Sequence, residues 1–192
     1  VRVPQHPTAR ELCRRSERPL AAPSANLFTQ LSPTRVEHIS PEIRAASEVV
    51  LDGGASKIGI ESTILSLVGQ PRLLRTGHIS AGQLAEVLGQ PIPEASPERI
   101  RLAPGQYARH YAPRTPLVLV DQLARSQPGL TFGDPQNPHQ LQMPTDPVGY
   151  AMLLYHSLYQ LDGADLESIG IERPPETADW SAVWERLRKA SA

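Results

Sequence analysis

The sequence PLAAPSANLFTQLSPT, residues Pro19–Thr34, indicates an α/β fold, because it combines a strand signal, a turn and the start of a helix. It begins with a short apolar run, Leu20–Ala22, which flanking prolines confine to a strand rather than a helix. A polar turn follows, and Ser32 then predicts the N-cap of a helix with Pro33 at its first position. A buried strand that leads to a helix N-terminus is a place where an open α/β sheet binds anions, although most serine-rich turns of this kind are ordinary helix caps.

The composition predicts a folded domain without a strong net charge. Hydrophobic residues make up 40% of the 192 residues, and the formal net charge is −1. No global field would therefore recruit nucleic acid or an acidic membrane surface. No apolar run approaches the length of about 18 residues that a membrane helix needs, and no signal peptide is seen, which favours a cytoplasmic protein. The nearest approach to a basic cluster, Arg186–Lys189, is predicted to be the solvated last turn of a helix.

Cysteine usage and the first residues limit the organisation further. The single cysteine, Cys13, excludes an internal disulfide and a cysteine metal cage, and its helical pattern predicts a small core residue. The chain opens with Val1 rather than methionine, as if a strand were already under way. We therefore expect a fragment whose N-terminal part is absent.

Alternating helices and strands predict an α/β protein with a small parallel sheet. Helices are predicted at 6–15, 33–38, 41–46, 81–88, 147–161 and 179–189. Strands are predicted at 1–4, 20–22, 49–51, 60–67, 72–75, 117–120, 130–132 and 168–172. Frequent prolines between the helix predicted at 81–88 and the strand predicted at 117–120 predict an extended linker at 91–115.

The common catalytic and metal-binding motifs are missing. The GGASK segment at 53–57 lacks the spacing of a phosphate-binding P-loop, the six histidines show no metal-ligand spacing, and no GxSxG, GxGxxG or CxxC motif occurs. What remains is a set of polar groups near predicted strand ends: Arg2, Ser24, Asn26, Ser32, Ser62, Thr63 and Arg75. Such groups suit phosphoryl or nucleotidyl transfer by positioning and electrostatics, but they are also common in any soluble domain.

Several motifs, in order and at matching intervals, resemble the later half of the YrdC/Sua5 domain. They are RVPxHP (2–7), PLAAPSAN (19–26), SPT (32–34), LDGG (51–54), GIEST (59–63) and LLRTGHI (73–79). The segment APGQ…RHYAP (103–113) resembles the linker into the C-terminal Sua5 domain, and residues 174–190 resemble the last helix of that domain. The resemblance implies part of a twisted open YrdC-like α/β sheet over 1–90, a linker over 91–115 and a small Rossmann-like parallel α/β Sua5 domain over 116–192.

The resemblance also implies an activity, that of an L-threonylcarbamoyladenylate synthase. This nucleotidyltransferase joins L-threonine, bicarbonate and ATP, releases pyrophosphate, and supplies the t⁶A modification of tRNA through a downstream transferase complex. Mg²⁺ would accompany ATP without a metal held by the protein, and any binding of tRNA would be weak.

Site residues are carried over from the matching motifs. L-Threonine would be held by Arg2, Thr63 and the backbone of Ala22. ATP would be contacted by Ser24, Asn26, Ser32 and Arg75, and Tyr111 would reach from the linker to close over the nucleotide.

The chain departs from the family pattern in three respects. Leu27–Leu31 stands where the family has a small polar loop, Thr76 replaces a proline, and the N-terminal half of the YrdC domain is not among these residues. We therefore expect no adenylate synthesis by this fragment alone, and unpaired strand edges in its first half. Two alternatives stay open: a non-catalytic relative that binds nucleotide or double-stranded RNA, and a C-terminal domain that serves chiefly in regulation or docking.

Overall fold

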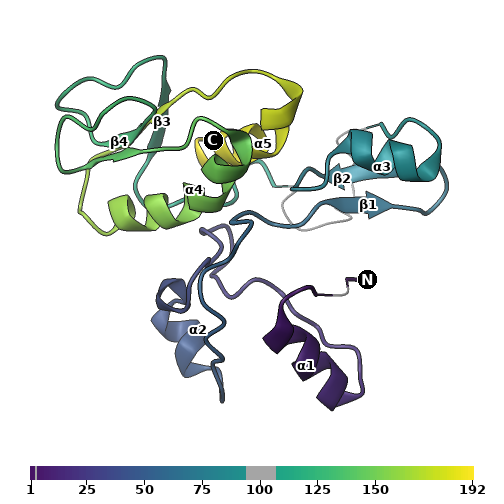
Figure 1. Cartoon of the computed structure of the whole chain (residues 1–192). Coiled ribbons are helices and arrows are strands. Elements are labelled where there is room, and N and C mark those ends of the chain that lie inside the picture. Colours follow the sequence, from purple (N-terminus) through teal and green to yellow (C-terminus); the bar gives the residue numbers. More distant parts are fainter. Residues whose placement is uncertain (3, 94–106) are drawn as a thin grey trace.

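A computed structural model describes residues 1–2, 4–93 and 107–192. Figure 1 shows α1 and α2 below the rest of the molecule, the β1–β2 hairpin with α3 on one side, and the larger sheet with α4 and α5 on the other. The elements are α1 (Pro7–Ser16), a 3₁₀ turn (Val36–His38), α2 (Pro41–Ala45), β1 (Ile64–Ser66), β2 (Arg72–Arg75), α3 (Ala81–Leu88), β3 (Leu117–Val120), β4 (Gly129–Thr131), β5 (Gln140–Gln142), α4 (Pro147–Asp162), β6 (Ile169–Glu172), a second 3₁₀ turn (Ala178–Trp180) and α5 (Ser181–Ala190).

The C-terminal part of the chain forms a four-stranded sheet in the order β3-β6-β4-β5, with every pair parallel. This arrangement confirms the α/β class predicted from the sequence. The strand β6 lies between β3 and β4, so Ile169 and Ile171 are fully buried. The backbones of β4 and β6 approach so closely that a Cβ at Gly129 would lie 1.9 Å from the carbonyl oxygen of Gly170. A side chain at this position would separate the two strands.

Helices α4 and α5 supply most of the remaining core. Helix α4 begins as predicted, because the Asp146 side chain accepts a hydrogen bond of 2.8 Å from the N–H of Gly149 and Pro147 takes the first helical position. Leu154 and Leu158 of this helix are buried in one hydrophobic cluster with Leu187 of α5. The two helices and the sheet therefore form one packed unit.

The first 93 residues contribute little to this core. None of the helices α1, α2 and α3 has a buried residue. Cys13 is only partly buried, so the prediction of a core cysteine is wrong. Strands β1 and β2 form a two-stranded antiparallel sheet, and large apolar side chains are exposed at Val49, Leu51, Leu67 and Val68. The hydrophobic core therefore lies mainly in the C-terminal part of the chain.

Several predicted elements differ from the structure. Strands are not formed at residues 1–2, 4, 20–22 or 49–51, because short apolar runs need a neighbouring strand to pair their backbone groups. Residues 20–22 are exposed rather than buried. The helix predicted at 33–38 is reduced to the 3₁₀ turn Val36–His38, whose N-cap is Arg35 and not Ser32. Strand β5 was not predicted, since it has only three residues and two of them are glutamine.

Other predicted boundaries are close to those observed. The helices at 6–15, 81–88, 147–161 and 179–189 correspond to α1, α3, α4 and α5, and the strand at 72–75 corresponds to β2. Most of the predicted linker lies at 94–106, outside the described residues. Across the described ranges, no helix is long and apolar enough to cross a bilayer.

Candidate functional site

The open ends of the β1–β2 hairpin bring predicted site residues together. Arg75 leaves β2, and its Nε donates a hydrogen bond of 2.9 Å to the carbonyl oxygen of Ser62 before β1. The Thr63 hydroxyl donates to the carbonyl oxygen of Ile79 at 2.7 Å and accepts from the Ile79 N–H at 3.1 Å. The backbones are in close contact, because a Cβ at Gly77 would lie 2.3 Å from the Thr63 nitrogen. The hairpin thus fixes Thr63 and Arg75 near one another.

Arg2 joins this group from the start of the chain. Its Nη1 donates to the Ser62 hydroxyl at 3.3 Å, and both side chains are exposed. A guanidinium group bonded to the Ser62 hydroxyl, one residue before Thr63, is suited to binding a carboxylate or a phosphate.

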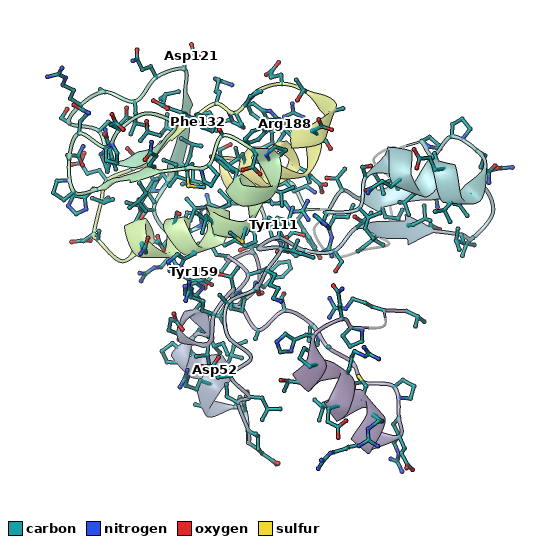
Figure 2. All side chains as sticks on the ribbon, viewed as in Figure 1. Asp52, Tyr111, Asp121, Phe132, Tyr159 and Arg188 are labelled. Carbon is teal, nitrogen blue, oxygen red and sulfur yellow. The ribbon has the colours of Figure 1, made fainter. Side chains whose placement is uncertain are left out.

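Tyr111, which precedes the parallel sheet in the chain, contacts Arg75 of the hairpin. Its phenol oxygen lies 3.3 Å from Arg75 Nη1, which donates to it, and only 1% of the residue is exposed. Figure 2 shows Tyr111 where the C-terminal unit meets the preceding segments. Burial, followed by the nearby charge of Glu61, raises the pKa of Tyr111, so the phenol stays protonated.

Ser32 does not cap a helix as predicted, and Asn26 bonds to the backbone of its own loop. Ser32 is buried, and its hydroxyl donates to the carboxylate of Glu61. The Asn26 amide donates to the carbonyl oxygens of Leu27 and Gln30, at 2.9 and 3.1 Å, and so fixes the loop between them. In the described part of the chain, the amide oxygen of Asn26 is buried without a hydrogen-bond partner.

The loop at 27–31 packs against the segment that carries Tyr111. The carbonyl oxygen of Thr29 accepts a hydrogen bond of 3.0 Å from the N–H of Ala112, and Phe28 makes an edge-on contact with His110. The apolar residues that depart from the family pattern therefore have a packing partner. Ala22 and Ser24 lie before this loop and are exposed; among the described residues, the Ser24 hydroxyl makes no hydrogen bond to the group.

The main residue that sequence reasoning missed is Glu61. Its carboxylate also accepts hydrogen bonds from the Tyr155 hydroxyl at 3.0 Å and from Arg186 Nε at 3.0 Å. It lies inside the GIEST motif, next to two residues that were singled out, and this position was the available signal. We define the buried polar cluster as Ser32, Glu61, Tyr111, Tyr155 and Arg186.

Arg186 corrects a second prediction. It was expected on the solvated turn Arg186–Lys189, but only 1% of its side chain is exposed. Helical spacing explains the burial, because Arg186 lies three residues after Val183 and four before Ala190, both on the buried face of α5. A run of basic residues did not reveal which one faces inward, whereas the helical period could have done so.

The neighbouring Glu185 contacts the hairpin as well. Its carboxylate accepts hydrogen bonds from the Thr76 N–H at 2.9 Å and from the Thr76 hydroxyl. Burial acts to raise the pKa of Glu185, but Arg186, Lys189 and Thr76 together lower it, so the group remains ionised. A proline at position 76 could supply neither donor.

A cavity of about 380 Å³ borders Thr76, between the segment that leads into α3 and the beginnings of α4 and α5. Its lining includes Ser80, Pro147 and Ser181 and none of the eight predicted substrate residues. We place the candidate site instead at the residues Arg2, Ser62, Thr63, Arg75 and Tyr111, because arginine and hydroxyl groups converge there. In the ranges that the structure describes, no cluster of three or more histidine, cysteine, aspartate or glutamate residues could hold a metal.

The parallel sheet and the arginine–hydroxyl group define an α/β protein suited to anionic small molecules. Comparisons with known proteins give the family. The family described as "Telomere recombination", the Sua5/YrdC domain, matches residues 1–77. The family described as "Threonylcarbamoyl-AMP synthase, C-terminal domain" matches residues 79–192. The chain therefore belongs to the Sua5 family of threonylcarbamoyl-AMP synthases.

Individual relatives agree with this assignment. The chain is 32% identical to the threonylcarbamoyl-AMP synthase of Pyrococcus abyssi over 100% of its own length and 63% of the relative. It is 40% identical to the Bacillus subtilis enzyme of that name over 63% of its own length and 36% of the relative. A crystal structure of P. abyssi Sua5 with L-threonine superposes with a TM-score of 0.84 at 29% identity, covering 99% of this chain and 63% of that one. The chain thus spans less than two thirds of these relatives.

Proposed function

We propose that this protein takes part in the synthesis of L-threonylcarbamoyladenylate. The amine of L-threonine combines with bicarbonate to give a carbamate and water. A carbamate oxygen then attacks the α-phosphorus of ATP, and pyrophosphate leaves. Mg²⁺ enters with ATP as part of the substrate, and the product serves t⁶A modification of tRNA through a transferase complex. We propose the cytoplasm as the location, since ATP, L-threonine and tRNA are all available there.

The residues act in this proposal by positioning and by charge rather than as nucleophiles. Arg2 pairs with the threonine carboxylate, and Thr63 with the backbone of Ala22 holds the rest of the amino acid. ATP is contacted by Ser24, Asn26, Ser32, Arg75 and Tyr111. A positive charge at Arg75 stabilises negative charge that develops on the phosphate oxygens during attack.

One observation supports this proposal most directly. Arg75 donates to both the Ser62 carbonyl oxygen and the Tyr111 hydroxyl, so the proposed ATP contact touches the segment that carries Thr63. Arg2 reaches the same segment through the Ser62 hydroxyl. Arg2, proposed for the carboxylate, and Arg75, proposed for the phosphate, both bond to Ser62, which supports a reaction between threonine carbamate and ATP at this place. The P. abyssi relative that was crystallised with L-threonine supports the amino-acid part.

The proposal is tested by measuring pyrophosphate release with the protein in its full natural length. Release is expected only when ATP, L-threonine and bicarbonate are all present, and omission of any one should abolish it. Arg75→Ala should reduce release strongly, whereas Arg114→Ala, a change at an exposed arginine in the C-terminal unit, should not. Pyrophosphate release that does not depend on L-threonine would contradict the proposal. Salt-dependent binding of double-stranded RNA without binding of ATP would favour the non-catalytic alternative.

A further inference from the structure

Arg186 of α5 holds both segments on which the candidate site is built. Its Nη2 donates to the backbone carbonyl oxygen of Glu61 at 3.2 Å, directly before Ser62 and Thr63. Its Nη1 donates to the carbonyl oxygen of Thr76 at 2.6 Å, directly after Arg75. One guanidinium group from the last helix therefore fixes the distance between the segment of Thr63 and the segment of Arg75.

The side chain of Glu61 adds a third connection. Arg186 Nε donates to Glu61 Oε2 at 3.0 Å, and the Tyr155 hydroxyl of α4 donates to the same oxygen at 3.0 Å. Only 1% of the Arg186 side chain and 12% of the Glu61 side chain are exposed. Ion pairs in such surroundings are screened little by salt, and removing one partner leaves an uncompensated buried charge.

The same guanidinium group also reaches the nucleotide side of the site. Its central carbon lies 5.3 Å from the centre of the Tyr111 ring, a cation–π distance. The Tyr111 hydroxyl in turn accepts a hydrogen bond from Arg75. Burial alone would lower the pKa of Arg186, but Tyr155, Glu61 and Glu185 raise it, so the charge persists.

We propose that Arg186, with Tyr155, is a positioning residue through which the C-terminal unit holds the substrate-binding residues in place. It acts through Glu61 on the proposed threonine contacts and through Tyr111 on the proposed ATP contact. The inference rests on the proposed function, since it concerns the affinity of that site for L-threonine and ATP. It assigns a role to α4 and α5 that is neither a separate regulatory module nor a docking surface.

The test compares two conservative variants with a matched control in the full-length protein. Arg186→Lys keeps the positive charge but loses the planar set of donors, and Tyr155→Phe removes one donor at nearly constant volume. Arg188→Lys makes the same change on the same helix at an exposed position, where the side chain packs on Trp184. Calorimetry gives the dissociation constants of L-threonine and of ATP, and thermal unfolding is recorded separately for each protein.

We expect Arg186→Lys to weaken binding of both L-threonine and ATP by at least about tenfold, as the loss of charge-assisted hydrogen bonds predicts. Tyr155→Phe should weaken binding of L-threonine less, by roughly threefold. Arg188→Lys should bind like the wild type. Affinities are measured well below the unfolding temperature of each variant, so a purely structural role would lower that temperature and leave the dissociation constants unchanged.

The outcomes separate this inference from the proposed function. A wild-type protein that binds neither L-threonine nor ATP would contradict the proposed function itself. A wild type that binds both, with wild-type affinities in Arg186→Lys and Tyr155→Phe, would overturn the positioning role and leave the proposed function intact. If Arg186→Lys does not fold, Tyr155→Phe decides between these outcomes, because it leaves the ion pair in place.

Discussion

Arg186 Nε lies 3.0 Å from Glu61 Oε2, although 125 positions separate the two residues in the chain. The pair joins the last helix to the segment before the hairpin, in surroundings that exclude most of the water. Bringing two charges out of water is costly, and the gain from pairing them only offsets that cost when further hydrogen bonds complete the geometry. Here Ser32 and Tyr155 complete the bonds to Glu61.

Removal of one partner of this pair should destabilise the protein strongly. Arg186→Ala leaves the Glu61 carboxylate buried without its cation, so we expect the free energy of unfolding to fall by about 3–5 kcal/mol. Urea denaturation measures the change. Arg14→Ala removes a partner from the exposed pair with Glu11 and should change stability very little. Equal effects of the two substitutions would show that the burial of Arg186 has no energetic consequence.

Position 76 tests the contact between the hairpin and α5. Thr76→Val removes the hydroxyl donor to Glu185, and Thr76→Pro removes the N–H donor as well. We expect losses of about 1–3 kcal/mol in the free energy of unfolding, larger for proline, because a half-buried carboxylate loses hydrogen bonds. Thr145→Val, at an exposed position, is the control. A stable Thr76→Pro variant would mean that Glu185 finds other donors.

The hydroxyl of Tyr111 should matter for the nucleotide. Tyr111→Phe keeps the buried ring and removes the acceptor for Arg75, so we expect weaker ATP binding and a loss of about 0.5–1.5 kcal/mol in stability. Tyr159→Phe loses a hydrogen bond of 2.6 Å to the carbonyl oxygen of Leu31 and serves as the matched control. The control should show a similar change in stability with unchanged ATP affinity. ATP affinity that falls equally in both variants would argue against a specific role for Tyr111.

Acid should weaken the contact between His38 and α4. Burial lowers the pKa of His38 below its ordinary value of 6.5, and the charge of His156 lowers it further, against the opposing charge of Glu37. The ring stacks on Tyr159 at 4.1 Å and lies against His156. The unfolded chain therefore binds a proton more readily than the folded one. The resulting stability is complete above pH 6.5 and is lost as the pH falls through the lower folded value.

The pH dependence can be assigned by substitution. His38→Gln should reduce the loss of unfolding free energy between about pH 7 and about pH 5, whereas His139→Gln, at an exposed histidine, should not. A remaining slope is expected from His110, whose pKa burial also lowers. An unchanged slope in His38→Gln would exclude His38 as its source.

Core packing gives a last prediction. Leu158 of α4 is 1% exposed, whereas Val148 of the same helix is 55% exposed. Leu158→Ala should lower the free energy of unfolding by about 2–5 kcal/mol, because it leaves a cavity in a packed core. Val148→Ala should have a much smaller effect on the unfolding transition. A small effect at Leu158 would mean that the core around α4 can collapse into the vacated space.

The sequence predicted regular elements well where local signals were strong. The helices predicted at 147–161 and 81–88 have clear end signals in the structure: Asp146 and Pro147 begin α4, and Ser80 and Gly89 cap the two ends of α3. Local signals failed where pairing decides, as at Leu20–Ala22, where three apolar residues have no neighbouring strand and remain exposed. They also failed at Ser32, which has the chemistry of a helix cap but donates to Glu61 instead.

Sequence alone thus determined the α/β class, the ordered motifs and the family they belong to, because these depend on residue order and spacing. It also selected Arg2, Thr63 and Arg75, whose groups suit anionic substrates. The helical period places Arg186 on the same face as Val183 and Ala190, but only the tertiary structure decided that this face meets Glu61, since a helix face becomes buried only when its partner has folded against it. For the same reason, the contribution of α4 and α5 to the candidate site depends on packing between residues far apart in the chain.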